Sequence, residues 1–356
     1  MQYLIESQLI LEYTLHRTCV GGNKGIQKDL DDGIDTIGKK MTVCQLYAKQ
    51  IRHRGNVRYN TKNGRKRLMK LLEEDKLGGC PIDSVKLSDA KEWAIRMKEK
   101  GISYKTISND KRSLKAAFYT AIQDDCIRKN PFDFQLNTVI EDDTEPKVPL
   151  TPAQEESFLS FAQNDKVYQK YYDELIILLG TGLRISELCG LTDTDINFEN
   201  RIINVDHQLL RSAETGYYIE TPKTKSGIRQ IPMSEKVYEA FNRVLKRRRG
   251  AKAVTFDGYS NFLFLNRDGY PKTATNYDGM FRGLAKKYNK YHEEALPKVM
   301  TPHTLRHTFC TNMANAGMNP KALQYIMGHS NITMTLNYYA HATFDSAKAE
   351  MLRIAA

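Results

Sequence analysis

The sequence predicts a mainly helical protein of two domains, the second of which also contains a small antiparallel β-sheet. Three observations lead to this fold class. Apolar residues recur three and four positions apart through most of the chain, which is the spacing of one face of a helix. Alternating apolar and polar residues, which favour strands, gather between positions 200 and 233. A linker rich in acid and proline at 141–150 separates two regions that are each long enough to form a core.

Residues 1–40 are expected to form a helical extension or linker. Their helical pattern is weak, Gly21 and Gly22 interrupt it, and an acidic stretch follows at 29–33. Nothing in this segment suggests chemistry of its own.

Residues 41–140 predict a helical domain of about four helices without strands, because four groups of apolar residues keep the helical spacing. Ser103 is expected to cap the fourth helix, and either Asp83 or Ser88 the third. Trp93, the sole tryptophan, lies at helical spacing with other apolar residues. It is therefore expected in the core of this domain.

Residues 151–356 predict a second domain that is mostly helical. Thr151 and Gln154 have the spacing of a capping box, so a helix should begin there. The pattern then changes to that of short strands, at 201–206, 217–220 and 230–233. The segment 223–229 is predicted to be the hairpin turn between the last two strands, and helices resume from 234 onward.

The charge of the chain points to a polyanionic partner. Lys and Arg total 53 against 42 Asp and Glu, which gives a formal net charge of +11. Part of this excess lies in a segment without a single acid, and its candidate nucleic-acid contacts are Arg52, Arg54, Arg58, Lys62, Arg65, Lys66 and Arg67. A second basic run occupies 246–249. A solvated helix face is the alternative for either run.

Several other classes of protein lack support in the sequence. No apolar stretch approaches the roughly 20 residues of a membrane-spanning helix, and the six cysteines lie far apart without a CxxC pair, as in reduced cytosolic proteins. Neither a P-loop nor a GxGxxG fingerprint is present. The histidines have no cysteine or carboxylate at zinc-ligand spacing. We therefore expect no metal, ATP, NAD or other cofactor.

Three separated clusters combine arginine, histidine and tyrosine, at 180–188, 301–307 and 327–341. Cleavage of a phosphodiester without a metal needs cations for the non-bridging oxygens, a nucleophile, a base and an acid. Arginine suits the first task because its planar fork binds two phosphate oxygens and stays charged when desolvated. A tyrosine nucleophile would form a covalent phosphotyrosine that conserves the energy of the broken bond. No external energy source is then required.

In this order and spacing, the three clusters resemble those of the tyrosine recombinases, the integrase family of phages and conjugative transposons. The resemblance is greatest to the integrases of conjugative transposons of Gram-positive bacteria, and it covers the chain from about residue 41 to its end. It implies a two-domain clamp around DNA, with a helical core-binding domain at 41–140 and a catalytic domain at 151–356 that ends in a tail. It also implies a site-specific recombinase that excises and integrates a mobile element through a 3′-phosphotyrosine intermediate.

Motif by motif, the resemblance implies six catalytic residues: Arg184, Lys223, His303, Arg306, His329 and Tyr338. The two arginines would hold the scissile phosphate and the two histidines would hydrogen-bond it. Tyr338 is implied as the nucleophile, with His303 as its candidate base, and the lysine as the acid that protonates the departing 5′-oxygen.

Two of these assignments have alternatives in the sequence. Lys225 lies in the same predicted turn as Lys223, and Tyr339 follows Tyr338 directly. Glu187, one turn after the first arginine, can cap its helix or orient that arginine, or it can take part directly, and it is not counted among the catalytic residues. His307 and His341 are expected to pack or to orient other groups, and Asp193 and Asp195 to cap turns rather than to bind a metal.

The implied partner is double-stranded DNA, either transposon ends and a target or a circular-intermediate junction. Two duplexes with two cuts each require four active sites, so a tetramer is expected, assembled through a tail helix at 346–354. An accessory DNA-bending or excision factor is a further possible partner, and the protein is expected in the bacterial cytoplasm at the nucleoid. Full-length relatives carry a β-rich arm-binding domain first, a pattern that 1–40 lacks.

Two other functions fit the same residues. A type IB topoisomerase uses a similar constellation but relaxes supercoils without exchanging strands. A non-catalytic DNA-binding protein with this fold would bind its site and leave Tyr338 unmodified.

Overall fold

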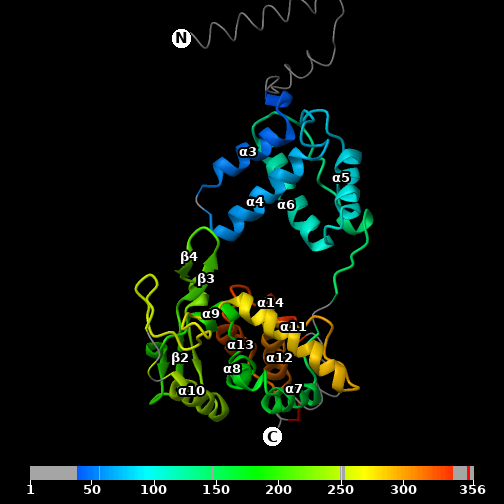
Figure 1. The fold of residues 1–356 in the computed structure, drawn as a ribbon. Helices are drawn as coiled ribbons and strands as arrows, with labels where there is room; N and C mark the ends of the chain where they lie inside the picture. The colour runs from blue at the N-terminus through cyan, green and yellow to red at the C-terminus, as the bar shows by residue number, and fades with distance from the viewer. Residues whose placement is uncertain are drawn as a thin grey trace, which may run out of the picture. The chain divides into compact units, whose positions relative to one another are not determined.

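The computed structural model describes residues 38–55, 57–145, 148–248, 250, 253–339 and 351–352. The chain divides into two compact units, Met1–Glu145 and Pro146–Ala356, and Figure 1 shows the elements of each. The predicted extension lies outside the described residues except for a short turn, Gly38–Lys40. The predicted tail helix also lies outside them apart from 351–352, as do His341 and Arg249.

The first unit is helical, as predicted. Its helices are α3 (Val43–His53), α4 (Tyr59–Glu73), α5 (Leu87–Glu99) and α6 (Tyr104–Gln123), with a 3₁₀ turn η2 (Leu136–Thr138). Ser103 caps α6 by accepting a hydrogen bond from the backbone N–H of Thr106. The expected cap of α5 is wrong, since Asp89 inside the helix accepts from the N–H of Lys86 at 2.8 Å. A carboxylate at the third helical position can satisfy that end as well as a residue before it.

Aromatic side chains fill the core of the first unit. Trp93 is fully buried and forms a T-shaped ring pair with Phe132 at a centroid distance of 5.7 Å. Phe118 from α6 packs on the same phenylalanine ring at 5.4 Å. The predicted core position of the tryptophan is therefore confirmed.

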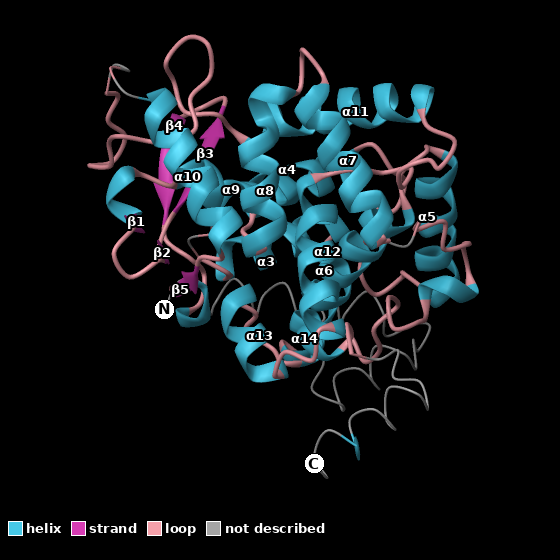
Figure 2. Ribbon diagram, turned by 90° about the horizontal axis from the view of Figure 1, so that it is seen from below, coloured by secondary structure: helices cyan, strands magenta, loops and turns pink. Residues whose placement is uncertain are grey.

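The second unit is also mostly helical, and helices dominate the view in Figure 2. Its helices are α7 (Pro152–Asn164), α8 (Tyr172–Thr181), α9 (Ile185–Gly190), α10 (Glu235–Arg248), α11 (Ala274–Tyr291), α12 (Pro302–Asn315), α13 (Pro320–Met327) and α14 (Thr333–Leu336). The predicted capping box is present, with Thr151 and Gln154 bonded to each other's backbone N–H at 3.1 Å. None of the helices in the described ranges is both long and apolar enough to cross a membrane.

The strands form two small antiparallel sheets instead of one. Their bounds are β1 (Ile196–Asn197), β2 (Ile202–Val205), β3 (Gln208–Ser212), β4 (Gly216–Glu220) and β5 (Arg229–Pro232). The first sheet has the order β1-β2-β5, and β3 with β4 forms a separate hairpin. The predicted hairpin turn at 223–229 is therefore wrong. This segment connects two sheets, because β4 pairs with β3 and β5 pairs with β2.

Candidate active site

The first arginine of the site lies in the turn between α8 and α9. Gly182 ends α8 with a φ of 63°, and a Cβ there would approach the Phe309 ring to 2.5 Å, so only glycine fits this turn. Arg184 is the N-cap of α9. Glu187 accepts from the backbone N–H of Arg184 at 2.9 Å and from its Nη1 at 2.6 Å. Both expected roles of the glutamate, capping and orienting, are therefore present.

The second arginine comes from α12 and is nearly buried. Arg306 is 6% exposed, and it donates to the carbonyl of Gly182 at 2.5 Å and to that of Met327. Burial, reinforced by the charge of Arg184, lowers the pKa of Arg306 to about 9. The guanidinium remains charged at neutral pH.

His329 follows directly on the end of α13. Gly328 closes that helix with a φ of 61°, and Nδ1 of His329 is 3.0 Å from the hydroxyl of Thr335. Burial and the nearby guanidinium of Arg306 lower the pKa of His329 to about 4. Its ring is therefore neutral at physiological pH and carries a single N–H.

The two candidate nucleophiles have different partners. The hydroxyl of Tyr338 lies 2.6 Å from Nδ1 of His307, a ring that can accept its proton. The hydroxyl of Tyr339 donates to the backbone carbonyl of Met318 at 2.5 Å. Burial raises the pKa of Tyr338 to about 12, so this phenol needs a base in order to attack. The contact with His307 favours Tyr338 as the nucleophile.

The remaining predicted residues are on the surface of the second unit. His303 is exposed in the first turn of α12, one turn before Arg306. Lys223 and Lys225 are both exposed in the connection between β4 and β5, and no side-chain contact among the described residues distinguishes them. The geometry thus joins Arg184, Arg306 and His329 closely, while the lysine assignment stays a prediction.

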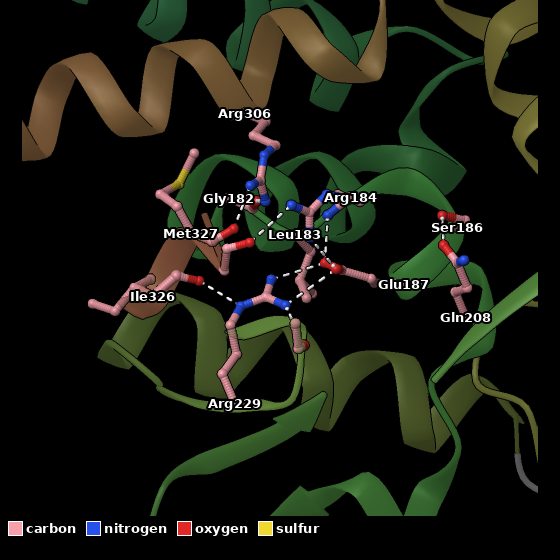
Figure 3. A network of polar contacts seen from close by, with 12 residues as sticks. Gly182, Leu183, Arg184, Ser186, Glu187, Gln208, Arg229, Arg306, Ile326 and Met327 are labelled. Atoms are coloured by element: carbon pink, nitrogen blue, oxygen red, sulfur yellow. Dashed lines mark hydrogen bonds and ion pairs between the residues drawn. The ribbon is translucent and has the colours of Figure 1, made fainter. Parts of the chain in front are cut away.

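One residue that joins the site, Arg229, was not singled out from the sequence, and another, His307, has a different role from the one expected. Arg229 of β5 is bonded to Glu187 at 2.8 and 3.1 Å, and Figure 3 shows it converging with Arg184 and Arg306. His307 was expected only to pack or orient, but it contacts the hydroxyl of Tyr338. Neither contact has a signal in local spacing, because each joins segments far apart in the chain.

The predicted DNA contacts of the first unit lie at the end of α3, in the connection that follows it and on α4. Five of the seven are exposed: Arg52, Arg54, Lys62, Lys66 and Arg67. Arg58 and Arg65 are half-buried. Arg67 pairs with the buried Asp110 at 2.5 Å, so its charge is partly neutralised within the unit.

The second basic run is engaged within its own unit. Arg247 pairs with the buried Asp173 at 2.6 Å, and Nε of Arg248 donates to the carbonyl of Phe262 at 2.5 Å. These contacts favour a structural role for both arginines.

One group in the described part of the chain has the spacing of metal ligands, Asp195 with Asp206 and His207. Both ring nitrogens of His207 are already engaged, one with Asp206 at 2.6 Å and one with the carbonyl of Gly190 at 2.8 Å. Asp195 accepts from the N–H of Thr192 at 2.7 Å, which is the turn-capping role that was expected. None of the predicted catalytic residues belongs to this group.

The site brings together two arginines and a neutral histidine, and a tyrosine paired with a histidine lies in the same unit. Residues 149–346 match the model of the phage integrase family. A relative, the transposase from transposon Tn916 of Enterococcus faecalis, is 68% identical over 329 residues, which cover 92% of this chain and 81% of the relative. The chain therefore belongs to the phage integrase family, and it is a tyrosine recombinase.

Two solved structures of a single relative agree with this assignment. The integrase of transposon Tn1549 in complex with a circular intermediate DNA is 78% identical, with a TM-score of 0.85 over 88% of this chain and 99% of that chain. The same integrase in complex with transposon right end DNA is also 78% identical, with a TM-score of 0.84 over 89% of this chain and 100% of that chain.

Proposed function

We propose that this recombinase excises and integrates a conjugative transposon by cutting and rejoining DNA through a 3′-phosphotyrosine intermediate. The observation that carries the proposal is the gathering of Arg184, Arg306 and His329 at one helix end, with Tyr338 as the accompanying nucleophile. The DNA substrates of the Tn1549 integrase, a circular intermediate and a transposon right end, support the same substrates here.

In the proposed reaction, Arg184 and Arg306 bind the non-bridging oxygens of the scissile phosphate, and His303 and His329 hydrogen-bond the same group. Tyr338 attacks phosphorus and loses its proton, and the bond from phosphorus to the 5′-oxygen breaks. Lys223 protonates that oxygen. In the second half-reaction a 5′-hydroxyl of the partner strand attacks the phosphotyrosine, and the tyrosine regains its proton.

We assign the role of the base that removes the proton of Tyr338 to His307, in place of the expected His303. Nδ1 of His307 lies 2.6 Å from the hydroxyl, within the reach that proton transfer needs. His303 is exposed one turn before Arg306, where it can donate a hydrogen bond to the phosphate.

The variants used for the Tn1549 integrase support the assignment of Arg184 and Tyr338 as catalytic residues. One of its DNA complexes carries an arginine replaced by lysine and another a tyrosine replaced by phenylalanine. These two positions are separated by the same number of residues as Arg184 and Tyr338 in this chain. If Tyr339 were the counterpart of the replaced tyrosine, the separation from Arg184 would differ from that in the Tn1549 integrase.

We assign DNA backbone binding in the first unit to 41–140, with 141–150 as linker and 151–356 as the catalytic domain. The exposed cations of α3 and α4 support this division, and binding that depends on them falls steeply as salt rises. Strand exchange between two duplexes requires four subunits, which we expect to assemble through 346–354, and the recombinase would act on DNA in the bacterial cytoplasm at the nucleoid. An accessory DNA-bending or excision factor is compatible with this scheme.

The test is incubation of the full chain with a nicked duplex that carries a candidate transposon end, followed by denaturing electrophoresis and peptide mapping. A nick beside the cleavage site lets a short 5′-hydroxyl fragment diffuse away, so the covalent intermediate accumulates. We expect an adduct on Tyr338 that Tyr338→Phe abolishes and that Tyr339→Phe retains. An adduct on Tyr339 would correct the nucleophile.

Two other outcomes would change the function. Relaxation of supercoils without any recombinant joint would indicate a topoisomerase. Tight binding to cognate DNA without any adduct would indicate a non-catalytic DNA-binding protein.

A further inference from the structure

Three guanidinium groups converge on three consecutive carbonyl oxygens at the C-terminal end of α13. Arg229 donates from Nε to the carbonyl at 326 at 2.6 Å, and Arg184 donates to that at 328 at 3.1 Å. Arg306 donates to the carbonyl between them, at 327. The last carbonyls of a helix lack partners in the helix and carry its negative dipole end. This helix end therefore determines where two of the proposed phosphate-binding arginines lie (Figure 3).

Arg229 differs from the other two because it is sealed from solvent. Its side chain is 0% exposed, and that of Glu187, its partner, is 4% exposed. Glu187 accepts from Arg229 with both oxygens, at 3.1 and 2.8 Å, and from the side chain of Arg184 with one, at 2.6 Å. Arg229 also donates to the carbonyl of Gly227 at 3.2 Å, in the connection that carries the candidate acid lysine.

We propose that Arg229 is a positioning residue for the cleavage reaction, which acts by satisfying Glu187 and so leaves Arg184 available to the phosphate. A buried carboxylate needs compensation from nearby charge. Arg184 already donates to one oxygen of Glu187 through Nη1. Without Arg229 the carboxylate would lose its two bonds to that residue, and the rest of the Arg184 fork would turn from the phosphate toward it. Arg229 itself is enclosed and does not contact the substrate.

The packing around Gly328 supports a fixed position for Arg229. A Cβ at Gly328 would lie 3.2 Å from Nη1 of Arg229 and 3.1 Å from the carbonyl of Ser226. The arginine therefore packs directly against the residue whose carbonyl holds Arg184. Lysine at 229 could reach Glu187 with its single ammonium, but it could not also supply the Nε contact to α13.

This inference rests on the proposed function, and its test measures adduct formation in a single turnover. The full-length wild type, Arg229→Met, Arg229→Lys and Arg184→Ala are compared on nicked duplexes whose scissile group is either a phosphodiester or a neutral methylphosphonate. The methylphosphonate has lost one charged oxygen, so its cleavage depends less on arginine. Arg201→Met is the matched control, since it removes an exposed Arg–Glu pair with 47% and 61% of the two side chains accessible.

We expect both Arg229 variants to cleave the phosphodiester about 100-fold more slowly, with DNA affinity within about threefold of wild type. On the methylphosphonate the deficit should shrink to about tenfold or less, as for Arg184→Ala. Arg201→Met should behave as wild type on both substrates.

Three results would overturn the proposal. These are normal phosphodiester cleavage by Arg229→Met, an equal deficit on the two substrates, and full recovery of cleavage by Arg229→Lys. If Arg229→Met does not fold, the lysine variant alone decides, with thermal melting to show that it is folded. Failure of the wild type to form any adduct would instead refute the proposed function.

Discussion

The contact between Tyr338 and His307 makes a prediction about the pH dependence of cleavage. A phenol with a pKa of about 12 is ionised in roughly one molecule in 10⁵ at pH 7, because burial disfavours the phenolate. A base at 2.6 Å removes the proton as the bond to phosphorus forms, and such general-base catalysis contributes about 10²- to 10⁴-fold. His307→Asn keeps a hydrogen-bond acceptor near the position of Nδ1 but cannot take up a proton. We therefore expect cleavage at pH 7 to fall by about 100-fold or more.

The sign of the pH effect follows from the raised pKa of the phenol. Without the histidine, the reactive species is the pre-formed phenolate, so the rate should rise about tenfold per pH unit above pH 7, until the loss of charge on Arg306, whose pKa is about 9, limits it. The wild type should vary much less over this range. The assay is single-turnover adduct formation on a nicked duplex, with Tyr339→Phe as the control for a neighbouring phenol. Equal cleavage by His307→Asn and wild type at pH 7, or parallel pH profiles, would refute the role of His307.

Three further predictions concern the acid, the DNA-binding unit and the fold. Lys223→Ala should slow cleavage of ordinary DNA about 100-fold, while DNA with a bridging 5′-sulfur should restore the rate, because a thiolate leaves without protonation. A larger defect in Lys225→Ala, rescued in the same way, would assign the role of the acid to Lys225. Lys62→Ala should weaken binding to all sequences similarly and reduce the slope of log affinity against log salt by about 1; an unchanged slope in a titration would remove this residue from the interface. Gly182→Ala should lower the unfolding free energy by about 3 kcal/mol, since it combines a positive φ with a clash, and denaturant unfolding like that of wild type would contradict the clash with Phe309.

Features that depend on local spacing could be predicted from the sequence. The helices of the first unit and the capping box at Thr151 follow from periodicity and from side chains three positions apart. The two roles of Glu187 toward Arg184 were also predicted, because these two residues lie within one turn of each other. The pairing of β5 was predicted wrongly, since strand partners depend on contacts between distant segments that alternation alone does not specify.

The contacts of the site depend on the fold for the same reason. Arg229 stood in a predicted turn, and nothing near it indicated that its side chain would cross to α9 and α13. The choice between adjacent tyrosines likewise required the positions of His307 and Met318. Local sequence supplies the types of groups in this site, and tertiary packing decides which of them meet.

The charge balance of the site suits the change in charge during the reaction. Three positive charges come from Arg184, Arg229 and Arg306. Glu187 carries one negative charge, because its arginine partners lower its pKa to about 2 against the effect of burial. His329 is neutral, since its pKa is about 4. The net charge of these groups is therefore about +2 at neutral pH. A phosphodiester brings one negative charge, and attack by a phenolate adds a second on the way to the five-coordinate phosphorus. The excess charge matches the transition state better than the ground state, and backbone carbonyls that hold the arginines in place add no opposing net charge. Such a site stabilises the transition state without reorganising during the reaction. The buried Arg229 does not touch DNA in this proposal, and it should therefore affect the rate of cleavage more than the affinity for DNA.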